Sequence, residues 1–395
     1  MSVGSLDIRK IDEWVESVEE DVVNWRRYLH RHPELSFHEE KTSQFVYDTL
    51  TSFGGLELSR PTKTSVVARL KGGRPGRVLA IRADMDALPI KEENDFEFVS
   101  QNEGVMHACG HDGHTAMLLG AAKILSRIKE DIPGEIRFLF QHAEELYPGG
   151  AEEMVQAGVM DGVDQVIGAH LWAPLEFGKI ALISGPMMAA PDAFHITIIG
   201  KGGHAAQPHL TTDSIAIAAQ VVTNLQHIVS RNVNPLVPLV VSVTQFIAGT
   251  THNVTPGSVY LNGTVRTFKP ELREEVPTLI ERIVKGVTDA HGATYKFKYE
   301  FGYRPVINDE RVTANLREVL TEAFGEDFIQ DGQPTMGGED FSAYQQKAPG
   351  CFFLIGAGNT EKGIIHPHHH PKFTVDEAAL PIGVKAFVTC ALKLV

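Results

Sequence analysis

Short apolar runs alternate with helical patterns in the first part of the chain. Four strands are predicted where mostly β-branched or apolar runs end at polar residues, at positions 66–70, 78–83, 136–141 and 165–171. Residues 115–128 have the apolar spacing of an amphipathic helix, and a helix is also expected from residue 11 until Pro33 interferes. This βαβ rhythm predicts an α/β fold with a mainly parallel sheet covered by helices on both faces. Its chemistry should lie at the carboxyl ends of the strands.

The pattern changes after Pro186. Strands that alternate apolar and polar residues are predicted at 193–199, 239–246, 257–267 and 295–301, with helices at 212–230 and 271–291. The order β-α-β-β-α-β is that of a ferredoxin-like unit. Because the βα rhythm returns from Pro305, we expect residues 188–302 to form a domain inserted into a catalytic domain made of residues 1–187 and 303–395.

Composition narrows the class of protein. The net charge of −14 argues against nucleic-acid binding, which needs a basic face. Residues 1–21 carry acids and bases throughout, unlike a signal peptide, and no apolar run approaches membrane-spanning length, so no membrane partner is expected. Three cysteines in a chain of 395 residues disfavour a disulfide framework and favour a reducing compartment. The expectation is a cytoplasmic protein.

Four candidate metal ligands fall within residues 107–114, directly before the helix predicted from Thr115. Cys109 and His111 lie two positions apart on a loop with Gly110, and a thiolate and an imidazole so placed suit a borderline-soft divalent metal. The alternative is a buried structural cysteine with surface histidines.

The second candidate is the pair Glu144 and Glu145, at the end of an apolar strand. Adjacent residues on an extended segment point in opposite directions, so one carboxylate could bind a metal while the other faces the substrate as general acid and base. The alternative is an acidic turn that opens the next helix.

Three weaker signals also follow predicted strands. His170 stands in an apolar strand, where a core histidine is the commoner explanation. Residues 366–370 contain four histidines. Residues 82–86 end a strand in two acids, Asp84 and Asp86, and a carboxylate there could orient a ligand imidazole or simply form a turn. Residues 201–206 form a glycine-rich turn that lacks the ending of a phosphate-binding loop, and no segment has the Gly-x-Ser-x-Gly pattern of a serine hydrolase.

Motifs of this kind extend over nearly the whole chain. They are residues 27–35, 82–89, 107–114, 144–145, 169–170, 202–206, 253–256, 263–266, 336–341 and 369–373. In this combination the sequence resembles the aminoacylase, hippurate hydrolase and auxin-conjugate (IAA-amino acid) amidohydrolase family of di-metal metallopeptidases. The resemblance implies a phosphorylase/hydrolase-like catalytic domain and an inserted ferredoxin-like dimerisation (lid) domain.

The resemblance also implies two divalent metal ions per subunit, Zn²⁺ or Mn²⁺, with Co²⁺ or Ni²⁺ as alternatives. The implied ligands are Cys109 as a bridge, His111, Glu145, His170 and His369. His369 is chosen because the family's last ligand stands two positions before a proline, here Pro371, although His368 and His370 are close alternatives.

Other roles are implied in the same way. Glu144 takes the position of the general acid and base, Asp84 supports a ligand, and Asn253 and Arg266 fall where the family contacts substrate or helps the interface. His204 resembles the histidine that reaches the site of a partner subunit, so a homodimer through the inserted domain is expected. Related exopeptidases carry histidine at the position of Arg82, which favours the amidohydrolase branch here.

The expected reaction is metal-dependent hydrolysis of the amide bond of N-acyl-L-amino acids (N-acetyl, N-benzoyl or similar) to a carboxylic acid and a free amino acid. Glu144 would take a proton from the attacking water and pass it to the departing amine. A metallo-carboxypeptidase or dipeptidase is the alternative enzyme. A metal-binding scaffold without catalysis is disfavoured, because storing metal requires no second carboxylate at Glu144.

Overall fold

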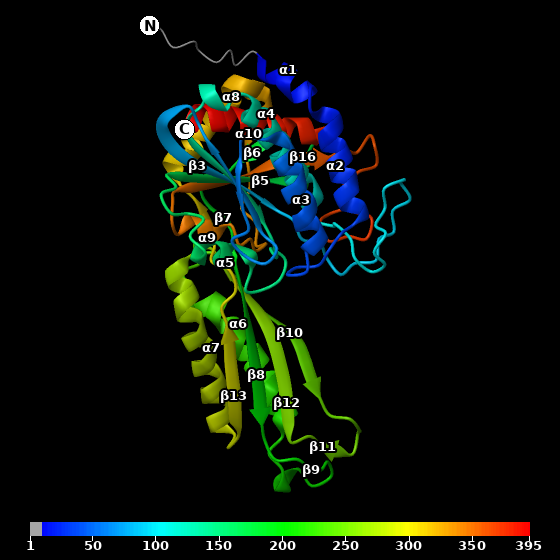
Figure 1. Cartoon of the computed structure of the whole chain (residues 1–395). Coiled ribbons are helices and arrows are strands. Elements are labelled where there is room, and N and C mark those ends of the chain that lie inside the picture. The colour runs from blue at the N-terminus through cyan, green and yellow to red at the C-terminus, as the bar shows by residue number, and fades with distance from the viewer. Residues whose placement is uncertain (1–9) are drawn as a thin grey trace. The chain divides into compact units, whose positions relative to one another are not determined.

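The computed structural model describes residues 10–395, and these divide into two compact units. The first contains residues 10–185, Ile307–Gln333 and Asp340–Val395; the second contains Pro186–Val306 and Pro334–Glu339. The second unit therefore includes a short segment, Pro334–Glu339, that the sequence pattern had placed with the catalytic part. Figure 1 traces both units along the chain.

An eight-stranded sheet forms the centre of the first unit. Its strands, in spatial order, are β1 (Glu57–Ser59), β2 (Val66–Lys71), β4 (Pro133–Gln141), β3 (Arg74–Asp84), β5 (Gln165–Glu176), β16 (Gly350–Gly358), β6 (Ile180–Leu182) and β15 (Ile329–Asp331). The four central strands β4, β3, β5 and β16 are parallel. Strand β1 pairs antiparallel with β2, β2 with β4 and β6 with β16, whereas the edge strand β15 pairs parallel with β6. The sheet is therefore mixed, and the expectation of a mainly parallel sheet holds only for its centre. Only residues 60–65 join β1 to β2, too few for the crossover that parallel neighbours require.

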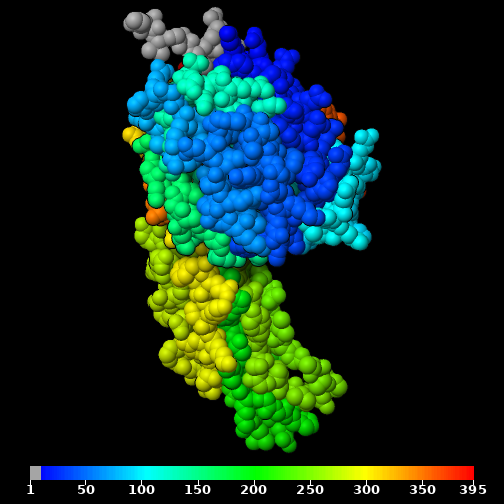
Figure 2. All heavy atoms as spheres, in the orientation of Figure 1, coloured from blue at the N-terminus to red at the C-terminus, as the bar shows by residue number. Residues whose placement is uncertain are grey.

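Helices cover this sheet. They are α1 (Ile11–Glu16), α2 (Glu19–Arg31), α3 (Glu40–Phe53), α4 (His111–Arg127), α5 (Gly150–Gln156), α8 (Glu310–Phe324), α9 (Ser342–Gln345) and α10 (Ala379–Leu394). The central helix α4 is buried over most of its length because it packs on β3 and is flanked by α2, α3 and α10. The single helix expected before Pro33 is divided into α1 and α2. In the space-filling view, residues of the N-terminal part, in blue, form much of the visible surface of this unit (Figure 2).

The second unit has a four-stranded antiparallel sheet of order β10-β12-β8-β13. The chain order is β8 (Ala190–Ile199), α6 (Ser214–His227), β10 (Leu239–Ala248), β12 (Ser258–Thr267), α7 (Pro270–Ala290) and β13 (Thr294–Glu300), the expected β-α-β-β-α-β sequence. Asp213 caps α6 by accepting hydrogen bonds from the amides of Ile215 and Ala216. Both helices pack on one face of the sheet around an aliphatic core, and β10 is an edge strand (Figure 1).

Two further pairs of short strands complete the structure. β9 (Gly203–His204) pairs with β11 (Val254–Thr255), and β7 (Gly185–Met188) pairs with β14 (Val306–Asn308). Across residues 10–395, none of the helices is both long and apolar enough to cross a membrane.

Candidate metal centre

Polar side chains gather at the carboxyl ends of the four parallel strands of the first unit. Asp84 ends β3, Glu144 and Glu145 follow β4, and His170 lies within β5. The loop after β16 carries His369, the loop before α4 carries Cys109, and His111 is the first residue of α4. Several groups of potential ligand atoms lie within 4.8 Å of one another here, among them Cys109–His111–His170, Cys109–Glu145–His369, His111–Glu144–Glu145 and Asp84–His111–His114. Segments far apart in the chain thus meet at the edge where a sheet of this kind collects its functional groups.

The imidazole of His111 is fixed in a defined orientation. Its Nδ1 lies 2.9 Å from the backbone oxygen of Asp86, which can only accept, so Nδ1 carries the hydrogen. In the neutral ring Nε2 then presents a lone pair, 3.7–4.0 Å from carboxylate oxygens of Asp84, Glu144 and Glu145. Within the described chain this buried Nε2 has no hydrogen-bond partner. A bound cation would satisfy a buried acceptor that carboxylates surround at this distance.

Gly110 makes this arrangement sterically accessible. Its φ of 93° lies in the left-handed region, where residues with a Cβ are disfavoured, and it directly precedes the first residue of α4. The turn brings Cys109 and His111 to the same side of the site, where both belong to one ligand group.

His170 is oriented in the same manner as His111. Its Nδ1 lies 2.8 Å from the backbone oxygen of Leu171, so Nδ1 is the donor and Nε2 faces the sulfur of Cys109 at 3.5 Å. His114, by contrast, uses both nitrogens: Nδ1 bonds Asp84 at 2.6 Å, and Nε2 accepts from the amide of Leu171 at 2.8 Å. His114 therefore supports the strand ends and has no lone pair to offer a metal.

The three late histidines differ in what their rings contact. Nε2 of His369 lies 3.1 Å from Oε1 of Glu145, whereas Nε2 of His368 already accepts from the amide of Ala173 at 3.3 Å. Nδ1 of His370 accepts from the amide of Lys372, and its ring stacks on His366. The structure thus brings His369, rather than its neighbours, to the carboxylate that follows β4.

Asp86, the second of the two acids at the end of the strand that carries Asp84, links two parts of the centre. Its Oδ1 lies 3.2 Å from Nδ1 of His111, and its Oδ2 accepts from the amide of Glu145 at 3.0 Å and from Oγ of Ser36 at 2.6 Å. Asp84, expected to support a ligand, accepts from His114 and Arg82, and its Oδ2 lies 3.7 Å from Nε2 of His111. The sequence of residues 82–86 indicates that either Asp84 or Asp86 could orient a histidine. The fold shows that Asp86 is the one that contacts Nδ1 of His111.

The electrostatics of the site show an excess of negative charge. Burial disfavours a charged imidazole at His111, but Asp84, Asp86 and Glu145 outweigh it and raise the pKa of His111 to about 10. Burial, together with Glu145, Glu144 and Asp84, raises the pKa of the Cys109 thiol well above its usual range. Without a cation, protons therefore occupy the positions from which these side chains would bind one.

The three residues of the second unit that the sequence predicted to act at the site or the interface lie at two different positions. His204 pairs with Val254 across the β9–β11 ladder, and the amide of Ala205 donates to the backbone oxygen of the adjacent Asn253 at 3.1 Å. Arg266 lies near the other end of β12, paired with Val240, roughly 26 Å along the strand from Ser258. The structure therefore brings His204 and Asn253 together and separates both from Arg266.

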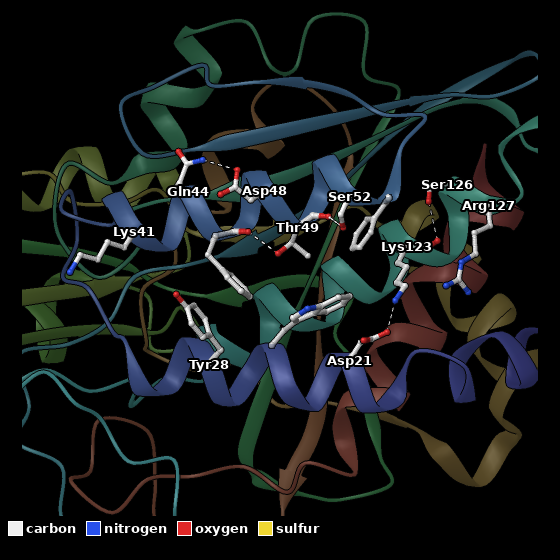
Figure 3. Close-up of a pocket in the computed structure, with 13 residues that line it drawn as sticks. Asp21, Tyr28, Lys41, Gln44, Asp48, Thr49, Ser52, Lys123, Ser126 and Arg127 are labelled. Atoms are coloured by element: carbon white, nitrogen blue, oxygen red, sulfur yellow. Dashed lines mark hydrogen bonds and ion pairs between the residues drawn. The ribbon is translucent and has the colours of Figure 1, made fainter.

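A surface groove of about 840 Å³ lies elsewhere on the first unit. Figure 3 shows that its walls are α2, α3 and α4, with Tyr28, Lys41, Asp48 and Arg127 among the lining residues. The ion pair of Lys123 with Asp21 crosses one end of it. The groove contains none of the residues at the strand ends, so its volume says nothing about the candidate centre.

The fold and these donors define a class: an α/β protein with histidine, cysteine and carboxylate groups converging at the carboxyl ends of parallel strands. Comparison with known proteins specifies it further. The model of peptidase family M20/M25/M40 matches residues 80–393, and the chain belongs to this family.

Individual relatives are similar over most of their length. The chain is 74% identical over 299 residues, 76% of this chain and 81% of the relative, to an N-acyl-L-amino acid amidohydrolase of Geobacillus stearothermophilus. It is 42% identical over 372 residues, 94% of this chain and 96% of the relative, to an N-acetylcysteine deacetylase of Bacillus subtilis. The crystal structure of a dinuclear metal binding peptidase of the M20 family from Bacillus subtilis superposes with a TM-score of 0.82, at 37% identity, covering 96% of this chain and 99% of that one.

Proposed function

We propose that the protein hydrolyses the amide bond of N-acyl-L-amino acids, releasing a carboxylic acid and a free amino acid. The observation that carries the proposal is the pair Glu144 and Glu145 beside the orphaned Nε2 of His111. A similarity of 74% identity to an N-acyl-L-amino acid amidohydrolase supports the same reaction.

We infer that the centre holds two divalent cations through Cys109, His111, Glu145, His170 and His369. The donor set fits because it combines thiolate, imidazole and carboxylate, as zinc and its first-row neighbours prefer, so Zn²⁺ or Mn²⁺ is proposed, with Co²⁺ or Ni²⁺ as alternatives. When bound, such ions supply Lewis acidity that makes water a nucleophile near neutral pH. The proposal assigns Asp86 to orienting His111 through Nδ1 and fixing Glu145 through its amide.

Glu144 is the proposed proton carrier. Its Oε2 lies 4.0 Å from Nε2 of His111, and only 7% of the residue is exposed, so it is held at the centre with little access to bulk water. Its carboxylate would accept the proton of the attacking water and donate it to the amine nitrogen as the amide bond breaks. Atoms balance without a covalent enzyme intermediate: water supplies OH to the acyl carbon and H to the amine.

A carboxypeptidase activity is the second candidate. The chain is 41% identical, over 98% of its length, to thermostable carboxypeptidase 1 of Saccharolobus solfataricus. Both reactions cleave an amide next to an amino acid and would use the same groups. They differ in what lies on the acyl side of the bond.

A substrate panel separates the two activities. Protein loaded with Zn²⁺ or Mn²⁺ is assayed for amine release from N-acetyl and N-benzoyl amino acids and from dipeptides, with chelator-treated protein as control. We expect metal-dependent turnover with the N-acyl amino acids at a higher kcat/KM than with dipeptides. A preference for dipeptides, or turnover that survives metal removal, would contradict the proposal.

We further propose a homodimer formed through the second unit, with residues 188–302 as the dimerisation domain. Support comes from the edge strand β10, on which Phe246 and Ile247 are exposed, because an open apolar edge favours pairing with a second copy. His204 is proposed to act in the site of the partner, with Asn253 and Arg266 contacting substrate or interface.

Complementation tests the partner role. Mixing Glu144→Gln and His204→Ala protomers should regenerate activity, because one site of the heterodimer then holds both intact side chains. A monomer in sedimentation, or no recovery after proven subunit exchange, would contradict it. A cytoplasmic location also stays a prediction, supported by three free cysteines.

A further inference from the structure

Glu39 is a fully buried carboxylate that none of the roles above uses. It directly precedes α3, yet its side chain does not cap that helix. The side chain instead lies against the loop that follows β4, the loop that carries Glu144 and Glu145. A buried carboxylate needs hydrogen-bond partners, and the identity of these partners points to a role.

A single oxygen of Glu39 accepts two backbone amides. Oε1 lies 2.8 Å from the amide nitrogen of Ala143 and 3.0 Å from that of Phe37, while Oε2 accepts from Oγ1 of Thr64 at 3.0 Å. Three segments that are distant in the chain, at residues 37–39, 64 and 143, are thereby tied to one side chain.

The two amides belong to strained residues. Ala143 has a φ of 50° and Phe37 a φ of 66°, in the left-handed region that residues with a Cβ rarely adopt. Within residues 10–395, His369 is the one other non-glycine residue with a positive φ. Such strain persists only where the surroundings hold the backbone in place, and Glu39 supplies that hold at both positions.

Ala143 is the residue immediately before Glu144. Its backbone oxygen accepts from the amide of Gly150 at 3.0 Å, and the amide of Glu145 donates to Asp86 at 3.0 Å. Glu39, Gly150 and Asp86 therefore anchor the backbone on either side of Glu144. Without the anchor at Glu39, the strained turn could relax and swing the carboxylate of Glu144 away from the reacting atoms.

We propose that Glu39 is a positioning residue for catalysis: it clamps the strained turn at Ala143 and so sets the direction of Glu144. The inference rests on the proposed function of Glu144. Burial, with Asp86 nearby, raises the pKa of Glu39 to about 7, so a neutral side chain of the same shape is compatible with the site. The clamp requires an acceptor oxygen at this place and no proton transfer by Glu39.

The experiment compares Glu39→Ala, Glu39→Gln and the control Glu40→Gln, which changes a neighbouring, exposed carboxylate. Glu39→Ala should lower kcat about 100-fold, because displacement of a catalytic group by about 1 Å costs that much. KM and the bound metal per subunit should stay close to wild type, since the proposed ligands are unchanged. Glu39→Gln, whose amide oxygen can accept both amides, should recover most of kcat.

Hydrogen exchange gives a readout that does not depend on activity. The amide of Ala143 should exchange faster in Glu39→Ala and return toward the wild-type rate in Glu39→Gln, while core amides of β3 stay protected. If Glu39→Ala does not fold, Glu39→Asp replaces it, because its shorter side chain withdraws the carboxylate from both amides.

Two results would overturn the inference. If Glu39→Gln is as inactive as Glu39→Ala, the carboxylate acts by its charge or proton rather than as a clamp. If kcat and exchange at Ala143 are unchanged in Glu39→Ala, the clamp does not position Glu144. A failure of the proposed function would give a different result, namely a wild-type protein that prefers dipeptides to N-acyl amino acids. In that case the kcat values of the Glu39 variants and the wild type can be compared on dipeptides.

Discussion

Replacing Glu144 by glutamine tests the division of labour between the two adjacent acids. The amide has nearly the same volume as the carboxylate, so packing at this largely buried position should be retained. It cannot accept a proton from water, and the chain offers Glu145, a proposed metal ligand, as the matched comparison. We expect Glu144→Gln to keep its metal and lose turnover, and Glu145→Gln to lose metal and turnover together.

The magnitude follows from the surroundings of Glu144. General-base catalysis contributes about 10²–10⁴-fold, or about 2.7–5.5 kcal/mol in the activation barrier. Glu144 is only 7% exposed, so buffer molecules and bulk water cannot easily reach the site and act as the base in its place. The expected loss in kcat is therefore toward the upper part of that range, about 10³–10⁴-fold.

The assay measures kcat on an N-acetyl amino acid by amine release, together with metal per subunit by mass spectrometry of the purified variants. A metal-loaded Glu144→Gln protein with near wild-type kcat would refute the assignment. Loss of metal from Glu144→Gln would also refute it, since Glu144 would then be a ligand, as its place in the group with His111 and Glu145 allows.

Three further changes should give distinct results. Asp86→Asn should weaken metal binding about 10–100-fold in chelator competition, because His111 and the amide of Glu145 lose a charged acceptor; unchanged affinity would exclude this role. Metal affinity of the apoprotein should rise with pH, because the pKa values of His111 and Cys109 are both raised and binding must release their protons; calorimetry in buffers of different ionisation enthalpy counts them. Bound metal should protect Cys109 from alkylation, while the fully buried Cys351 and Cys390 should react in neither form, and equal rates at Cys109 with and without metal would exclude it as a ligand.

The sequence predicted the parts of the fold that depend on local periodicity. The runs at 78–83, 136–141 and 165–171 correspond to β3, β4 and β5, because each is a mostly apolar segment whose residues are nearly all buried. The three-residue strands β1, β6 and β15 were not predicted, since so short a run has no measurable alternation. Two of them, β1 and β6, also contribute antiparallel pairings, in addition to that of β2 with β4, which make the sheet mixed.

Only part of the candidate site could be predicted from the sequence. Cys109, His111 and Glu145 were identifiable because their chemistry is unusual in so short a span after strands. The roles of Asp86 and Glu39 depend on contacts with residues 25 and 104 positions away, respectively, and no local pattern encodes such contacts. Positive φ angles at residues with a Cβ are equally invisible in sequence, because Phe37 and Ala143 favour other conformations.

Arg82 on β3 determines whether the end of this strand is suited to binding a metal. Its guanidinium is almost fully buried and donates to Gln141 at 2.7 Å, to Asp84 at 2.6 Å and to Asp340 at 2.9 Å. A fixed cation in this place repels a metal and neutralises the carboxylates beside it, so the end of β3 is suited to orienting other groups. The proposed coordination then falls to Cys109 and to His111, the first residue of α4, which the turn at Gly110 presents. Replacing Arg82 alone would therefore remove the guanidinium that balances the charge of two buried acids, Asp84 and Asp340.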